Sequence, residues 1–146
     1  MTAVACTFCA GGRPAADHRI ADLGVTPAYL HDDQFFPGWV VLVLRRHATE
    51  LFDLDVDERA RMMDEVARVA LALTTMFAPR KINYECLGNQ VPHIHWHVIP
   101  RLTDDPAPRD AVWTVAHAPV TLTAAQRDER IAGLRAALRE EPSRSR

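Results

Sequence analysis

The alternation of apolar and polar positions along the chain predicts about five β-strands. In residues 81–87 and 93–99, two kinds of side chain alternate from one position to the next. This is typical of strands whose two faces meet different surroundings. Residues 39–44 form a short continuous apolar run, as expected of a buried strand. Residues 19–31 are broken by a glycine and a proline, a pattern compatible with a hairpin.

Apolar residues at three- and four-residue spacing predict two helices. The first covers residues 55–77, begins at Asp55 with a pattern resembling a capping box, and ends before Pro79. Its predicted apolar face consists of Val56, Met63, Val66, Ala70, Leu73 and Phe77. A second helix is predicted over residues 123–139, after a mostly irregular loop over residues 102–119.

Few helices and mainly non-crossover strands predict an α+β domain. The length of 146 residues fits a single domain over residues 1–146. The formal net charge of -2 argues against binding of a nucleic acid polymer, because that requires clustered Lys and Arg, but it permits a small anionic ligand. No apolar run approaches the ~20 residues that span a bilayer, and no signal peptide pattern is present. We therefore expect a cytoplasmic protein without a membrane partner.

The cysteines indicate a metal site rather than disulfides. Cys6 and Cys9 form a C-x-x-C pair that precedes every predicted strand, which favours zinc over a thioredoxin-like redox pair. A structural zinc site needs four ligands, so two more must come from elsewhere, with histidine as the expected donor. Cys86 lies alone in a strand and is expected to contribute only packing.

Three histidines in residues 93–99 carry the strongest chemical signal. Because side chains alternate along a strand, His93, His95 and His97 share one face. The opposite, apolar face can pack on the helix 55–77; it carries Ile94, Trp96 and Val98. Outer members of such a set lie ~13 Å apart, so a single metal ion does not easily collect all three. A division of labour among the histidines is the preferred interpretation, and a metalloenzyme that uses two of them with an open metal position is an alternative.

These residues resemble the histidine triad superfamily. The segment 93–99 matches its pattern His-φ-His-φ-His-φ-φ at all seven positions, where φ is hydrophobic, and the family's frequent Pro-Arg pair follows it. The segment 37–47 resembles the strand that leads to a basic pair and a histidine. The C-x-x-C pair resembles the N-terminal knuckle of zinc-containing members. The stretch 104–113 resembles the C-terminal segment of a bacterial, diadenosine polyphosphate hydrolase-like group.

The resemblance implies a HIT-like fold, an antiparallel sheet of about five strands with one long helix and a C-terminal helix. The family features cover a core of about residues 4–101, and residues 102–146 form a loop and the C-terminal helix. Members of this size commonly form homodimers through the long helix and a strand, so a homodimer is expected.

The resemblance also implies chemistry at the α-phosphate of a nucleotide. His95 is expected to attack the phosphorus and form a covalent nucleotidyl-histidine intermediate. His97 is expected to contact the phosphate oxygens and the leaving group, as a cationic or as a hydrogen-bonding imidazole. His93 either orients the site or binds metal. The expected substrates are dinucleoside polyphosphates or related nucleotide conjugates.

In zinc-containing members, the first triad histidine joins the knuckle and a histidine after the Pro-Gly strand. The implied ligand set is Cys6, Cys9, His47 and His93, which closes the coordination shell and makes the zinc structural.

Substrate-binding residues are assigned by the same resemblance and by their backbone chemistry. The glycine-containing turn before the triad offers amide donors for a phosphate. An acidic residue before the Pro-Gly strand is expected to hold the ribose, and an asparagine in the preceding strand is expected to face the ligand. The candidates are Gly88, Asn89, Gln90, Asp32, Asp33 and Asn83, and His31, directly before the acidic pair, is a further candidate near the ribose.

Two other activities remain open. The protein is alternatively a nucleotide-binding regulatory protein with weak turnover, or a nucleotidyl transferase. Gln90 stands near the position where phosphoramidate-cleaving members carry a serine, which weighs against an amine leaving group. Transferases often carry glutamine in place of the third histidine, so His97 favours hydrolysis.

Overall fold

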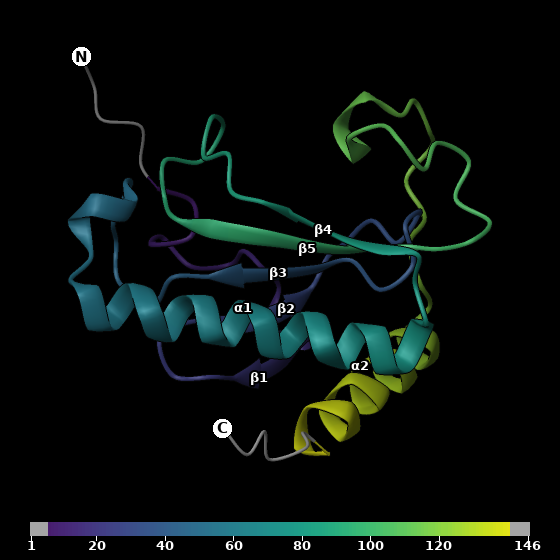
Figure 1. The fold of residues 1–146 in the computed structure, drawn as a ribbon, viewed down its shortest axis with the longest axis horizontal. Coiled ribbons are helices and arrows are strands. Elements are labelled where there is room, and N and C mark those ends of the chain that lie inside the picture. The colour runs from purple at the N-terminus through teal and green to yellow at the C-terminus, as the bar shows by residue number, and fades with distance from the viewer. Residues whose placement is uncertain (1–5, 141–146) are drawn as a thin grey trace.

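A five-stranded antiparallel sheet with strand order β1-β2-β3-β5-β4 forms the centre of the computed structural model (Figure 1). The structure describes residues 6–140; the remaining residues of the predicted domain 1–146, including the first two of the predicted core 4–101, lie outside this range. The strands are β1 (Arg19–Asp22), β2 (Pro27–Leu30), β3 (Val40–Val43), β4 (Lys81–Glu85) and β5 (His95–Arg101). The predicted α+β class and antiparallel sheet are confirmed.

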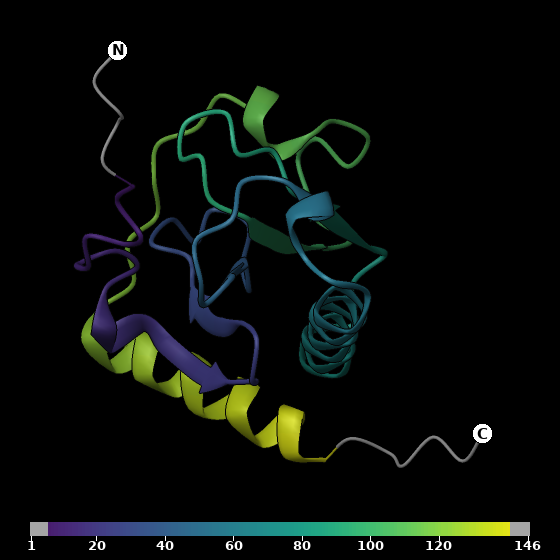
Figure 2. The same ribbon diagram turned by 90° about the vertical axis from the view of Figure 1, so that its left-hand side faces the viewer.

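Two helices pack on one side of this sheet, as predicted (Figures 1 and 2). α1 (Val56–Phe77) contacts β5, and α2 (Ala124–Arg139) packs against both α1 and β1. Asp55 caps α1 by accepting a hydrogen bond from the backbone N–H of Glu58, and Ala78 ends it in the left-handed conformation directly before the proline. Within residues 6–140, neither helix combines the length and the apolar character that a membrane-spanning helix requires.

The sheet is covered on both faces, which explains the continuous apolar run of β3. Val40 and Leu42 face the core under α1, where they meet Val66, Leu73 and Val98. The alternate residues of β3 face a second cluster, which the N-terminal segment and the loop after β5 help to cover. That cluster comprises Phe36, Trp39, Val41, Val43, Ile99 and Val112.

The predicted apolar face of α1 is partly wrong. Val56 is 70% exposed and Met63 is 43% exposed, whereas Met62 is fully buried. The buried stripe runs through Met62, Val66, Val69 and Leu73, so Met63 lies ~100° around the helix from its centre. Several apolar stripes are available on this helix, and packing on the sheet selects one of them.

The histidine-bearing strand begins later than predicted. β5 starts at His95, whereas the backbone N–H of His93 donates to the carbonyl of Val91 at 2.8 Å in a tight turn. Alternation along the sequence extends through this turn, because the rings of His93 and His95 lie on the same side of the chain and both contact the ring of Phe8. Only the backbone hydrogen bonds distinguish the turn from the strand.

A buried glutamate holds the β1–β2 turn against α1. Glu65 is 5% exposed, and its carboxylate accepts hydrogen bonds from the N–H groups of Val25 and Thr26 at 2.8 and 2.7 Å and from the Thr26 hydroxyl at 2.5 Å. Gly24 has a φ of 126°, and a Cβ there would lie 2.9 Å from Oε1 of Glu65. The glycine therefore leaves room for the carboxylate.

Replacement of this carboxylate should destabilise the fold. In Glu65→Ala, the buried N–H and hydroxyl of Thr26 lose their acceptor, so we expect the free energy of unfolding to fall by about 3 kcal/mol. Urea denaturation measures this change. The exposed neighbour Asp64 offers a matched control, because Asp64→Ala should change stability by only about 0.5 kcal/mol. Equal losses in both variants would contradict the assigned role of Glu65.

Candidate functional site

The strand β5 separates the core from a histidine-lined face. Val98 and Trp96 pack on the core side with α1, and Ile94, just before the strand, packs against Met62. His95 and His97 project from the opposite face, and their ring centroids lie 5.1 Å apart. The predicted division of the two faces is therefore confirmed.

The tautomer of His95 follows from its backbone partner. Nδ1 of His95 lies 2.6 Å from the carbonyl oxygen of His93, and a carbonyl only accepts hydrogen bonds, so Nδ1 carries the proton. In the neutral imidazole, Nε2 then holds the lone pair. His95 is 8% exposed, and its ring borders the cavity described below. This arrangement presents a nucleophilic nitrogen to a ligand.

His97 has the opposite tautomer. The indole N–H of Trp39 donates to Nδ1 of His97 at 3.1 Å, so the proton of the neutral ring is on Nε2. Burial, together with the neighbouring His95 and His31, lowers the pKa of His97 to about 3. At neutral pH this side chain is therefore an uncharged hydrogen-bond donor. Of the two forms that the sequence analysis allowed, a cationic and a hydrogen-bonding imidazole, the structure favours the second.

A cavity of about 440 Å³ opens in front of these two histidines, a size typical of small-molecule sites. Three segments far apart in the sequence enclose it: the N-terminal segment, the end of β2 with the residues after it, and the turn before the triad. Among the residues that line it are Phe8, His31, Asp32, Gly88, Asn89, Gln90, His95, His97 and Trp113. The three turn residues and Asp32 thus lie where a ligand of His95 would contact them.

Two of the predicted substrate-binding residues lie elsewhere. The carboxylate of Asp33 accepts hydrogen bonds from the backbone of Phe35 and Val120 at 2.9 Å and contacts Nε2 of His117 at 2.7 Å. Asn83 accepts from Nη1 of Arg101 at 2.7 Å. Neither is among the residues that line the cavity, and their predicted roles in binding stay predictions.

Arg101 organises the loop beyond β5. Its guanidinium binds Asp105 at 2.5 Å and the carbonyls of Ala107 and Asp110 at 2.6 and 2.7 Å. Side chains of Arg101 and Asp105 are 3% and 1% exposed. This buried, fully hydrogen-bonded pair fixes the loop that leads to Trp113, whose ring lies 4.9 Å from that of His97.

The sequence analysis missed Trp113 as a cavity residue and gave His31 only as a further candidate beside the acidic pair. His31 stacks on Trp39 with a centroid distance of 4.0 Å and an interplanar angle of 8°, and burial lowers its pKa. Trp113 is 49% exposed and donates its indole N–H to Glu85. His31 directly precedes Asp32, so its position beside the expected ribose-binding residues was the available signal. Trp113 belongs to the stretch 104–113 with its family resemblance, but no hydrophobic periodicity in that loop predicts where its side chain lies.

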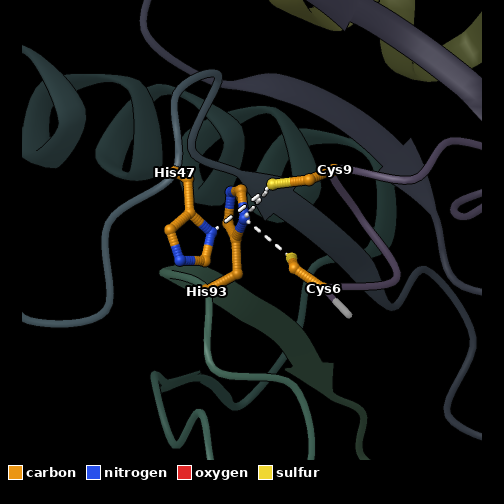
Figure 3. A group of neighbouring side chains, drawn as sticks. All are labelled: Cys6, Cys9, His47 and His93. Atoms are coloured by element: carbon orange, nitrogen blue, oxygen red, sulfur yellow. Dashed lines mark hydrogen bonds between the residues drawn. The ribbon is translucent and has the colours of Figure 1, made fainter. Parts of the chain in front are cut away.

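The four predicted metal ligands lie together beside the cavity (Figure 3). Their candidate ligand atoms all lie within 4.8 Å of one another. Nδ1 of His93 is 3.3 Å from Sγ of Cys6 and 3.5 Å from Sγ of Cys9, and Nδ1 of His47 is 3.4 Å from Sγ of Cys9. Nitrogen and sulfur ligands on one tetrahedral zinc ion are about 3.6 Å apart, so this donor set fits zinc.

Hydrogen bonding orients the buried ligand of this cluster. Nε2 of His93 lies 2.7 Å from the carbonyl oxygen of Leu44 and therefore donates its proton there. The unprotonated Nδ1 faces the two cysteines. A histidine held in this way by a backbone carbonyl is the usual arrangement around a metal ion.

Comparisons with known proteins agree with this geometry. A family model described as HIT domain matches residues 15–104. Bis(5'-nucleosyl)-tetraphosphatase (asymmetrical) of Schizosaccharomyces pombe is 26% identical over 95 residues, which represent 62% of this chain and 52% of that protein. The chain thus spans about half the length of this curated relative.

Solved structures extend the comparison over most of the chain. A histidine triad protein from Bradyrhizobium japonicum is 36% identical, with a TM-score of 0.76 and coverage of 82% of this chain and 89% of that one. One from Marinobacter aquaeolei VT8 is 31% identical, with a TM-score of 0.78 and coverage of 89% and 95%. A zinc-bound histidine triad family protein from Mycobacterium smegmatis is 26% identical, with a TM-score of 0.68 and coverage of 93% and 94%. The chain belongs to the histidine triad (HIT) family.

Proposed function

We propose that this protein is a nucleotide hydrolase that cleaves at the α-phosphate of dinucleoside polyphosphates or related nucleotide conjugates. The observation that carries the proposal is the pair of complementary tautomers on β5. His95 offers a lone pair on Nε2 and His97 offers an N–H on Nε2, with the two rings side by side in one cavity. The fungal relative, a bis(5'-nucleosyl)-tetraphosphatase, supports the same substrate class.

The first step of the proposed reaction is attack of Nε2 of His95 on the α-phosphorus. A P–N bond forms and the P–O bond to the leaving group breaks, so the leaving phosphate departs with the electron pair. The N–H of His97 stabilises the negative charge that develops on oxygen. A leaving phosphate can depart as an anion, whereas a leaving amine requires a proton. Because the pKa of His97 is about 3, its ring is neutral at pH 7 and has no additional proton to give a leaving amine, which favours anhydrides over phosphoramidates as substrates.

The second step is hydrolysis of the covalent intermediate. A water molecule attacks the same phosphorus, the P–N bond breaks, the lone pair returns to Nε2 of His95, and the proton of the water is released. The products are a nucleoside monophosphate and the leaving group of the first step. Amides of the turn at Gly88, Asn89 and Gln90 are suitable donors to the phosphate oxygens, because this turn lines the cavity.

We assign Cys6, Cys9, His47 and His93 to a structural zinc ion. When bound, such an ion joins the N-terminal segment to the start of β5 by closing a four-ligand shell. The zinc-bound relative from Mycobacterium smegmatis supports this assignment. Two thiolates must remain reduced to bind the metal, which suits the cytoplasm as the compartment.

A homodimer is also proposed. β4 is an edge strand of the sheet and carries the half-exposed Tyr84, and a strand edge favours pairing with another chain. Exposed apolar side chains gather before and at the start of α1, and such patches are typical of interfaces. They are Leu51, Phe52, Val56 and Met63.

His95→Ala should abolish turnover. We expect kcat for hydrolysis of diadenosine tetraphosphate to fall by roughly a thousand-fold or more, because no other group in the cavity replaces the nucleophile. Product formation followed by chromatography measures this, and the wild type quenched under alkaline conditions should carry one covalently bound nucleoside monophosphate by mass spectrometry.

Circular dichroism and calorimetry with AMP control for folding and binding. Undiminished hydrolysis would exclude His95 as the nucleophile, and tight AMP binding with negligible turnover by the wild type would favour a regulatory protein.

Trp39→Phe should disturb His97 specifically. It removes the N–H that binds Nδ1 of His97, so the ring can place its lone pair toward the substrate phosphate, and we expect kcat/KM to fall about ten-fold. Nitrogen NMR of labelled histidines should show the changed tautomer.

In the wild type, His97 should stay neutral and produce no acid limb in the pH–rate profile between about pH 5 and pH 8, because its pKa is about 3.

A matched control comes from the neighbouring tryptophan of β5. The indole N–H of Trp96 has no hydrogen-bond partner within the described part of the chain, and its ring lies on the core side. Trp96→Phe should therefore leave the His97 tautomer and the catalytic rate unchanged. An unchanged tautomer in Trp39→Phe would refute the positioning role of Trp39.

The proposed dimer predicts a particle of twice the mass of one chain in light scattering after gel filtration. Val56→Asp should shift it to the monomer, because a charge would be buried in the interface. An aspartate in the first turn of a helix is favourable in the free chain, so folding should be retained. A monomeric wild type would contradict the proposal.

A further inference from the structure

The N-terminal segment that carries the cysteines also forms a wall of the nucleotide cavity. Phe8 lies between the two cysteines in the sequence, and its ring meets that of His95 edge-on with a centroid distance of 5.1 Å. The same ring lies 5.5 Å from that of His93. Thr7, Arg13 and Pro14 line the cavity as well. One short segment therefore contributes both metal ligands and ligand-contacting side chains.

This segment has little regular structure of its own. Residues 6–14 belong to no strand or helix, and their backbone hydrogen bonds are local, from Ala10 to Cys6 and from Gly11 to Phe8. Their connections to the body of the protein include the cysteine–histidine contacts, the half-buried ring of Phe8 and an exposed ion pair of Arg13 with Asp32 at 3.7 Å. An exposed ion pair contributes little, so the cysteine cluster and the packed ring of Phe8 are the main attachments.

A second connection runs through His93. The ring of this residue presents Nδ1 to the cysteines and donates from Nε2 to Leu44, which fixes the residue on both sides. Its backbone carbonyl accepts the hydrogen bond that sets the tautomer of His95. The metal cluster and the nucleophile are thus joined by one residue, independently of Phe8.

We propose that metal binding at the four-ligand cluster and nucleotide binding in the cavity are thermodynamically coupled, and that Phe8 is the positioning residue that transmits the coupling. The bound metal holds segment 6–14 so that Phe8 covers the side of His95, and the cavity then has its complete wall. This inference rests on the proposed function, because it takes a nucleotide as the ligand of the cavity. By linkage, a metal that raises nucleotide affinity is itself bound more tightly, by the same factor, when the nucleotide is present.

The experiment measures the coupling from both sides. Calorimetry gives the affinity for AMP of the zinc-loaded protein and of the protein after removal of zinc with a chelator. Competition with a chelator gives the affinity for zinc with and without saturating AMP, and this second measurement starts from the intact zinc-loaded protein. Both should yield the same factor, about ten-fold and within the about 5- to 150-fold range usual for coupled sites.

Phe8→Ala tests the transmitting residue. This variant keeps all four metal ligands, so it should bind one zinc ion per chain, measured by elemental analysis, while the coupling factor falls below that of the wild type to the part transmitted through His93. Val120→Ala serves as the control, because it truncates an exposed apolar residue that is not among those lining the cavity and should keep the full factor. Circular dichroism of each metal-loaded variant verifies the fold.

Each outcome has a distinct meaning. A zinc-loaded wild type that does not bind AMP would overturn the proposed function, and the coupling with it. Equal AMP affinity with and without zinc, together with a zinc affinity that AMP does not change, would overturn the coupling while leaving nucleotide binding in place. A coupling factor in Phe8→Ala equal to that of the wild type would remove Phe8 from the role proposed for it.

Discussion

The pleat of β5 is the constraint on which the remaining structure depends. This strand lies between β3 and β4, and its side chains alternate between the core under α1 and the cavity. Burial of Val98 and Trp96 against the helix fixes the register of the strand, and a slip by one residue would turn the histidines into the core. The hydrophobic core therefore orients the histidines toward the cavity.

Hydrogen bonds then give the two cavity histidines different chemistry. The identical side chains at 95 and 97 become an acceptor and a donor because one ring donates to a backbone carbonyl and the other accepts from a buried indole. Burial keeps His97 uncharged, since a cation there would be poorly solvated. The two histidines of the site therefore differ only in their surroundings.

Irregular segments complete the cavity, and polar contacts hold each of them. The Arg101–Asp105 pair and its backbone acceptors fix the loop before Trp113. The cysteine–histidine cluster ties the N-terminal segment to the start of β5. Neither segment has a hydrophobic periodicity that would define its path, so side-chain anchors replace secondary structure as the source of order.

The sequence by itself determined the α+β class, the two helices, the opposite faces of the histidine strand and the group of four candidate metal ligands. These follow from periodicity and from motifs whose residues are close in the chain or matched to a family pattern. Tertiary structure decided which stripe of α1 is buried, where β5 begins, and that Asp33 and Asn83 bind other side chains instead of lining the cavity. It also decided the tautomers and the places of His31, Phe8 and Trp113. Those features depend on contacts between residues far apart in the sequence, and no local pattern encodes such contacts.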